Sequence, residues 1–213
     1  MKILLILLLL CSPYTFAKKI VDTNLLMTLD LDQMQSLVRK HIHLSEDIAI
    51  KSQQNGDENV NDVLFQLKKA ALLVFARPNR DFMTSRILPE VRKHLHSYSA
   101  YHPTLISLVK ESSAIIADKS SDVKAKSTYY YVIENILGEL KPHVLKKEEE
   151  SIKVYRSIAS AKIKIPKKLS NFRLLEKMED GDFDPSGYAQ RVLDKALKGK
   201  KKEKKSWWKK MFG

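Results

Sequence analysis

Residues 128–140 read TYYYVIENILGEL and carry the most regular apolar pattern in the chain. The apolar positions are Tyr129, Val132, Ile133, Ile136, Leu137 and Leu140. Spacing of three and four residues brings these positions to one side of an α-helix, whereas a strand would need alternation every second residue. The pattern predicts a core helix that is weakened in its last turn by Gly138 and stopped at Lys141-Pro142.

Three consecutive tyrosines, Tyr129, Tyr130 and Tyr131, open this stripe and cover about 200° of a helix. The favoured interpretation is one core ring, one boundary ring and one surface ring. The alternative is that an exposed ring lies at a groove as a recognition residue, because tyrosine offers a broad rigid face and a hydroxyl. Both interpretations expect at least one ring to point away from the core.

The helical period recurs along most of the chain. Apolar stripes with this spacing cover residues 34–48, 60–75, 83–95, 105–116, 129–140, 152–159, 172–178 and 188–197. Asp30 is expected at the start of the first helix and Asp184 as the cap of the last, while Pro89 should kink the third or split off its first turn. Residues 53–59 are polar and rich in turn formers, so we expect a loop there. The alternating pattern of residues 162–166 (KIKIP) has an extended, strand-like segment as its alternative interpretation.

A faint internal repeat pairs residues 69–95 with residues 111–137, through apolar class and turn position. Each copy is expected to be helix, short turn and helix, with a period in the range of HEAT and armadillo units. Any two amphipathic hairpins of similar length would align about as well. The predicted fold class is therefore all-α, with antiparallel helical hairpins forming an irregular bundle or a short HEAT-like array, followed by a disordered or interfacial basic C-terminal tail.

The first seventeen residues have the composition of an export signal. Met1-Lys2 is a charged start, residues 3–10 are an unbroken apolar run, and Thr15-Phe16-Ala17 places small residues at the −3 and −1 positions of a cleavage site. The apolar run is shorter than the roughly 20 residues that a membrane-spanning helix needs. We therefore expect a signal peptide over residues 1–17, cleavage between Ala17 and Lys18, and a periplasmic or extracellular location.

The only cysteine, Cys11, lies within this leader. Its removal would leave the mature chain without a thiol or a disulfide, which is compatible with an oxidising compartment. The alternative is that Cys11 is a lipid attachment site. The bulky Leu10 directly before it disfavours this alternative, because such sites carry a small residue there.

Positive charge is concentrated at the C-terminus. The formal net charge of the chain is +13, and residues 198–213 hold eight lysines against the single acid Glu203. The expected organisation is the signal peptide, an all-helical domain over residues 18–197 and a basic tail over residues 198–213. Gly199 is expected to break the last helix of the domain.

The tail combines its lysines with aromatic residues. If it forms a helix, Trp207 lies above Met211 and Trp208 lies above Phe212, giving one apolar patch flanked by ammonium groups. Tryptophan favours the membrane interface, and lysines are attracted to an anionic leaflet. The alternative is a disordered, solubilising tail. The residues expected to bind a membrane or another polyanion are Lys200, Lys201, Lys202, Lys204, Lys205, Trp207, Trp208, Lys209, Lys210 and Phe212.

No motif in the sequence indicates a metal or another cofactor. The six histidines are His41, His43, His94, His96, His102 and His143. His41 and His43 are two residues apart, and so are His94 and His96, whereas metal-binding pairs on a helix are three or four residues apart. Residues 180–184 (DGDFD) open like a calcium loop, but Pro185 and Arg191 occupy the positions of its glycine and its bidentate acid. His41 lies on an apolar stripe and is interpreted as a core or edge residue.

The favoured hypothesis is an exported, non-enzymatic helical binding or scaffold protein. Its tail would attach peripherally to an anionic membrane or another envelope polyanion, and its helical body could bind a protein partner. Nucleic acid ranks below these partners, and the oligomeric state stays open. One alternative is an envelope enzyme whose site gathers scattered residues such as His94, His96, His102 and Glu134. Another is a secreted effector with a polyanion-binding tail.

Overall fold

The computed structural model describes residues 29–56, 59–76, 83–121, 123–163 and 184–212. The expected leader, with its cleavage point between Ala17 and Lys18, and the stripe over residues 172–178 lie outside these residues. The elements are α3 (Leu31–Asn55), α4 (Val60–Phe75), the π-helical segment η1 (Met83–Ile87), α6 (Leu88–Ser97), α7 (Tyr101–Ala117), α8 (Val123–Leu145), α9 (Glu149–Ser160) and α10 (Pro185–Phe212). No strand occurs in this part of the chain, so the all-α class is confirmed.

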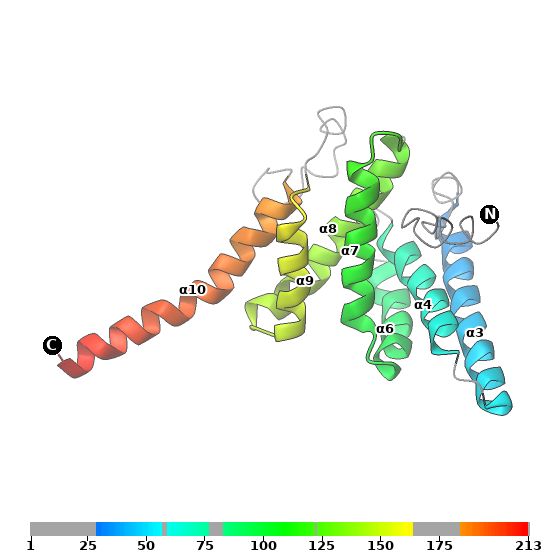
Figure 1. Cartoon of the computed structure of the whole chain (residues 1–213), viewed down its shortest axis with the longest axis horizontal. Coiled ribbons are helices and arrows are strands. Elements are labelled where there is room, and N and C mark those ends of the chain that lie inside the picture. The colour runs from blue at the N-terminus through cyan, green and yellow to red at the C-terminus, as the bar shows by residue number, and fades with distance from the viewer. Residues whose placement is uncertain (1–28, 57–58, 77–82, 122, 164–183, 213) are drawn as a thin grey trace, which may run out of the picture.

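The helices follow one another across the molecule from α3 to α10 (Figure 1). α3 packs mainly on α4, α7 mainly on α8, and α9 mainly on α10. α8 also contacts α4, α9 and α10, so it occupies the centre. The Nδ2 of Asn135 on α8 donates to the carbonyl of Phe75 at the end of α4, at 2.7 Å. Buried apolar side chains form one continuous core from Met34 to Ala196.

Two of the expected helix boundaries are confirmed by their hydrogen bonds. At the start of α3, the amide of Gln33 donates to Asp30 Oδ1 at 2.8 Å, and the amide of Asp30 donates to Gln33 Oε1 at 3.0 Å. This reciprocal pair is a capping box. Pro89 lies at the second position of α6, directly after the π-helical η1, so it does split off the turn that precedes it. Residues 53–55, expected in a loop, extend α3 up to Gly56, whose φ of 73° ends it.

The expected stop at Lys141-Pro142 is wrong, because α8 continues through Pro142 to Leu145. Proline removes one helical hydrogen bond, but packing on either side supports the helix. Val144 is fully buried, and the hydroxyl of Tyr155 on α9 donates to the carbonyl of Leu137 at 2.6 Å. Tertiary contacts therefore outweigh the local cost of the proline.

The expectation that one of the three tyrosines points away from the core is also wrong. Tyr129, Tyr130 and Tyr131 are exposed by only 5%, 4% and 8%. Neighbours surround α8 on several sides, so consecutive positions are all covered. Burial, with a further contribution from Glu134, raises the pKa of Tyr131 to about 12. None of the three rings is therefore available as an exposed recognition residue.

Candidate functional site

The candidate site is α10, whose first turn is fixed by the residue that precedes it. The Oδ1 of Asp184 accepts from the amide of Ser186 at 3.1 Å, and its carbonyl accepts from the amide of Tyr188 at 2.8 Å. A Cβ at Gly187 would lie 2.6 Å from Asp184 Oδ2, so glycine leaves room for the capping carboxylate. Asp184 therefore caps this helix, as the sequence predicts.

The first three turns of α10 are built into the body. The hydroxyl of Ser186 donates to the carbonyl of Ile158 at 2.9 Å and accepts from the amide of Ile163 at 2.8 Å. Lys141 of α8 places its ammonium 5.7 Å from the centroid of the Tyr188 ring. The buried apolar side chains of this segment are Tyr188, Ala189, Val192, Leu193 and Ala196. They pack on α8 and α9 and hold the helix to the rest of the molecule.

Packing ends at Ala196, but the helix does not. Leu197 is 39% exposed, and the Nζ of the exposed Lys198 lies 3.6 Å from Asp194 one turn earlier. The helix then continues through Gly199 to Phe212, so the expected break at Gly199 is wrong. Glycine costs only about 1 kcal/mol inside a helix, and lysine, alanine and leucine around it are good helix formers.

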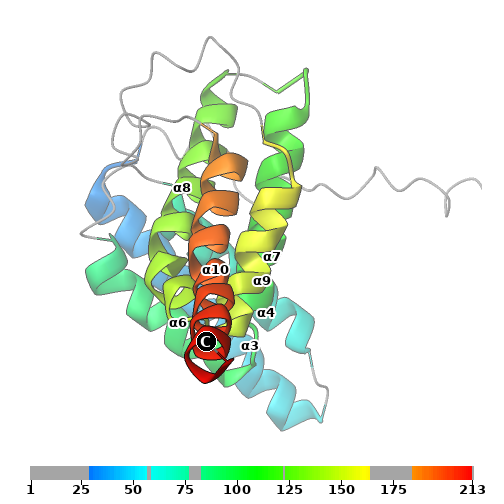
Figure 2. The same cartoon turned by 90° about the vertical axis from the view of Figure 1, so that its left-hand side faces the viewer.

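Residues 197–212 are named the arm here. At 1.5 Å per residue the arm is about 24 Å long, and it points away from the other helices (Figure 1). In Figure 2 the view runs towards its C-terminal end. Every residue expected to bind a polyanion, from Lys200 to Phe212, belongs to this one helix. Their backbone is described, whereas their side chains lie outside the description.

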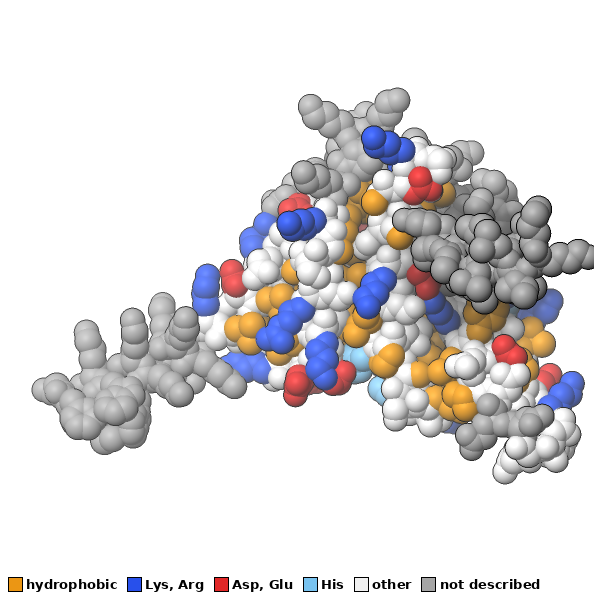
Figure 3. Space-filling model, in the orientation of Figure 1, with side chains coloured by type: hydrophobic (Ala, Val, Ile, Leu, Met, Phe, Trp, Pro, Cys, Tyr) orange, Lys and Arg blue, Asp and Glu red, His pale blue; other side chains and the backbone are white. Residues whose placement is uncertain are grey.

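Charge on the body is mixed in comparison. On the face shown in Figure 3, lysine and arginine side chains are interspersed with acids and hydrophobic groups. Several cations are paired: Arg39 lies 3.8 Å from Glu90, and Lys68 pairs with Glu111 between α4 and α7. The excess of lysine in the sequence is therefore concentrated in the arm.

The sequence did not reveal a cluster of rings and charges at two helix turns. The α6–α7 turn has Ser99 at a φ of 51°, with the amide of Ala100 bonded to the carbonyl of Leu95 at 2.8 Å. The α8–α9 turn has Lys147 at a φ of 66°, with the amide of Glu148 bonded to the carbonyl of His143 at 3.1 Å. Both are Schellman turns with a residue other than glycine in the left-handed position.

Tyr101 is the centre of this cluster. Its ring centroid lies 5.0 Å from that of His96 and 5.3 Å from that of His102. Its hydroxyl donates to Glu139 at 3.2 Å, and Arg92 pairs with the same carboxylate. Only 5% of Tyr101 is exposed, so this arrangement ties α6, α7 and α8 together rather than presenting a reactive group.

His102 links the cluster to α9. Its Nε2 lies 3.4 Å from the buried hydroxyl of Ser151. Burial is the main cause that lowers the pKa of His102, and the charges of His96 and His143 act in the same direction. Glu150 opposes them. The neutral imidazole is therefore the form that this junction favours.

The histidines lie in three places, and one of these holds His96 and His102 beside Tyr101, with His143 close enough to lower the pKa of His102. His94 lies 3.3 Å from Glu46 on α3, which also contacts His43 at 3.2 Å, whereas Glu134 acts on Tyr131. His41, as expected, is a half-buried edge residue, with Nδ1 2.9 Å from Gln66 Oε1, and burial lowers its pKa. Among the described residues no three histidine, aspartate or glutamate side chains are grouped so that they could hold a metal ion.

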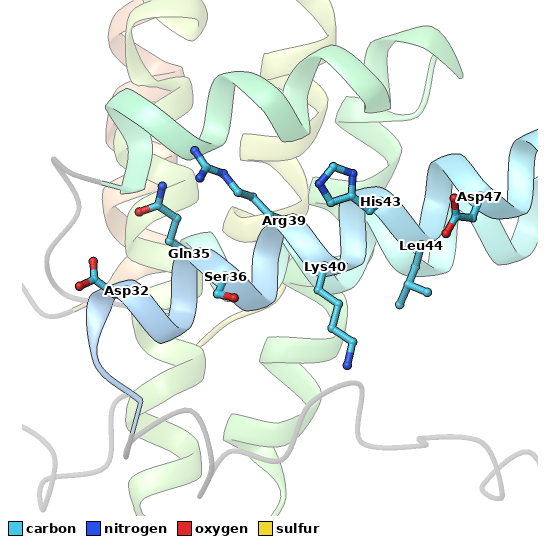
Figure 4. A pocket seen from close by; sticks show the side chains of 8 residues that line it. All are labelled: Asp32, Gln35, Ser36, Arg39, Lys40, His43, Leu44 and Asp47. Atoms are coloured by element: carbon cyan, nitrogen blue, oxygen red, sulfur yellow. The ribbon is translucent and has the colours of Figure 1, made fainter.

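An open groove of about 620 Å³ runs along α3. Its lining residues are Asp32, Gln35, Ser36, Arg39, Lys40, His43, Leu44 and Asp47. In Figure 4, Gln35 and Arg39 point to one side of this helix, while Lys40 and Leu44 point to the other. Groups that diverge from a single helix do not form the convergent set that catalysis requires.

No family model, curated protein or solved structure matches this chain. Within the described ranges, no helix combines the length and the apolar composition needed to cross a bilayer.

Proposed function

We propose that this chain is an exported, non-enzymatic helical binding protein that is held at an anionic membrane surface by its arm. The composition of residues 1–17 supports export, and the lysine and tryptophan content of the arm supports the membrane. The observation that carries the proposal is the continuation of α10 beyond Ala196, its last buried residue, to Phe212. This arrangement projects the most basic segment of the chain away from the body.

The arm has enough charge for peripheral attachment. Residues 198–213 carry a net charge of +7. Each lysine near an anionic leaflet contributes about 1 kcal/mol before screening by salt, and each 1.4 kcal/mol is a factor of ten in affinity. Because positions 207 and 211, and positions 208 and 212, are four apart on a continuous helix, each pair shares a face. Both tryptophans of the chain are on these faces, where they could enter the interface.

The proposed body is a short array of antiparallel hairpins, α3–α4, α7–α8 and α9–α10. The pairwise packing of these helices supports the hairpins, and the limited packing between α6 and α7 makes the array irregular. An array of this kind offers a broad surface on which a protein partner could bind. The arm would hold that surface at the membrane.

The test compares the mature chain, beginning at Lys18, with the same chain ending at Leu197. Each is mixed with vesicles of phosphatidylglycerol and phosphatidylcholine and pelleted. The intact chain should pellet with the vesicles and the shortened chain should stay in the supernatant. Because burial ends at Ala196, the shortened chain should lose only the helical signal of the arm and keep its melting temperature. Equal, negligible pelleting of both chains would contradict the proposal.

Two further measurements separate the contribution of charge from that of apolar contact. Vesicles of phosphatidylcholine alone should bind the intact chain at least tenfold more weakly. A variant with Trp207→Ser and Trp208→Ser keeps every lysine, so it should bind anionic vesicles at low salt but detach at a lower salt concentration than the intact chain. Since no other tryptophan is present, a blue shift of the intrinsic tryptophan emission on binding would report insertion of the arm itself.

Fractionation of the source cells addresses location. Recovery in the periplasmic or envelope fraction would support the proposal. Recovery in the culture medium would favour a secreted effector instead. Retention of an intact Met1 on a cytosolic product would remove the export step.

A further inference from the structure

The helical register of α10 determines which side of the body lies next to a membrane that the arm contacts. Positions 207 and 211 follow Ala189 and Leu193 by eighteen residues, which is five turns of 3.6 residues. Ala189 and Leu193 are buried against the body. A surface that contacts positions 207 and 211 therefore lies on the same side of α10 as α8 and α9.

The part of the body nearest to the start of the arm is the α8–α9 turn. α8 and α10 run side by side in the same direction (Figures 1 and 2). The ammonium of Lys141 lies 5.7 Å from the Tyr188 ring centroid, which aligns this level of α8 with the start of α10. One turn beyond Lys141, α8 ends at Leu145. A flat surface on that side of the arm would therefore meet residues 145–150, which are named the corner here.

The corner places two lysines beside an exposed apolar side chain, ahead of three glutamates. Leu145 is 39% exposed, and Lys146 and Lys147 are exposed beside it. The acids that follow have partners nearby: Glu149 and Glu150 both lie within 3.9 Å of Lys153, and Glu148 lies 2.8 Å from His143, which is charged only when protonated. Residues 145–153 hold three lysines and three glutamates, so their formal charge is zero, and the local feature that suits a lipid headgroup is the pair Lys146 and Lys147 next to the exposed Leu145.

We infer that the corner is a second contact with the anionic phospholipid bilayer, with Leu145 at the interface and Lys146 and Lys147 at the lipid phosphates. This inference rests on the proposed function of the arm. A bilayer is a flat, continuous surface, so it can reach both the corner and the arm, and it accepts an apolar side chain below a layer of anionic groups. A second copy of the chain is disfavoured as the occupant, because it would bring two arms of +7 together.

The first test is the variant Lys146→Glu/Lys147→Glu in the mature chain, with the same vesicles of phosphatidylglycerol and phosphatidylcholine. We expect the partition coefficient to fall at least tenfold. The matched control is Lys110→Glu/Lys119→Glu, which makes the same change of net charge at exposed positions of α7 and of the opposite turn. We expect less than a threefold fall for the control. Circular dichroism and melting temperature verify that both variants fold.

The second test places a polarity-sensitive fluorophore on the corner through Leu145→Cys, and in a control through Lys119→Cys. The mature chain has no other cysteine once the leader is removed. On addition of anionic vesicles, the label at 145 should shift to the emission of an apolar environment, whereas the label at 119 should stay aqueous.

The outcomes separate the two proposals. If the chain ending at Leu197 loses binding while the corner variant binds like its control, the arm binds the membrane and the corner does not. An aqueous emission at position 145 on bound protein would lead to the same conclusion. If the shortened chain binds as well as the intact one, the proposed function fails first.

Discussion

Gly199→Pro tests whether the arm acts as a rigid extension of the body. Proline lacks the amide hydrogen that a helix donates to the carbonyl four residues earlier, and its ring clashes with that carbonyl. It is about 2 kcal/mol less favourable than glycine inside a helix, which is a factor of roughly 30 against a continuous α10 at this point. Gly199→Ala is the matched control, because alanine strengthens the same position by about 1 kcal/mol.

The expected result is a variant that binds but is no longer oriented. All lysines and both tryptophans remain, so Gly199→Pro should pellet with anionic vesicles within about threefold of the parent chain. The label at position 145 should nevertheless return towards its aqueous emission, since the corner no longer follows the arm. Gly199→Ala should keep the emission of the membrane-bound parent.

The stability of the body provides an internal check on the same variant. Nothing beyond Ala196 is buried in the described side chains, so Gly199→Pro should change the free energy of unfolding by less than about 1 kcal/mol in urea titrations. A larger loss would mean that the arm packs on the body. A label that is as buried in Gly199→Pro as in Gly199→Ala would refute the reasoning about a rigid, oriented arm.

Two further predictions concern the body. Burial lowers the pKa of both His41 and His102, so the unfolded chain takes up protons at higher pH than the folded one. The free energy of unfolding should therefore be constant above the histidine pKa of the unfolded chain, about 6.5, and fall as the pH drops below it. Urea midpoints between pH 8 and pH 5 would show this, and His41→Gln/His102→Gln should flatten the slope. Asn135→Ala removes the donor to the buried carbonyl of Phe75 and should cost about 1–3 kcal/mol by urea titration, with no change in vesicle binding by the arm. A urea midpoint that does not change with pH would contradict the histidine argument, and an unchanged midpoint in Asn135→Ala would contradict the hydrogen-bond argument.

Local signals in the sequence were sufficient for much of the helix pattern. Asp30 and Asp184 both accept from the amides of the turns they cap, and Pro89 separates α6 from η1. Each of these effects acts within four residues, so a single sequence contains all the information needed. The all-α class follows from the same period, summed over many turns.

Two expected boundaries failed for different reasons: at Pro142 packing opposes the local preference, and at Gly199 the neighbouring helix formers outweigh the cost of one glycine. Pro142 and Gly199 each weaken a helix, yet α8 and α10 continue through them. At Pro142 the opposing terms are the burial of Val144 and the hydrogen bond from Tyr155, which joins residues eighteen apart in sequence. Tyr130 and Tyr131 are buried for the same reason, because the number of helices around α8 is a tertiary property.

The sequence likewise predicted one part of the candidate site and missed the rest. The composition of residues 198–213 was sufficient to select the tail, because charge and aromatic content need no fold. The corner could not be found, since its relation to the arm depends on Lys141 lying beside Tyr188, forty-seven residues later. The contact between His102 and Ser151 spans forty-nine residues and has no motif.

A continuous helix does something that a flexible basic tail cannot do. A flexible tail tethers a body to a membrane but leaves its orientation free, because each linker residue can rotate independently. In α10 the same helix is fixed at one end by Asp184, Ser186 and the buried apolar face, and it carries the lysines at the other. Position 207 lies on the same side of the helix as Ala189, eighteen residues earlier. Binding of the arm therefore also selects which end of the body meets the lipid. For this reason a break at Gly199, which removes no charge, is expected to have a larger effect on the corner than on affinity.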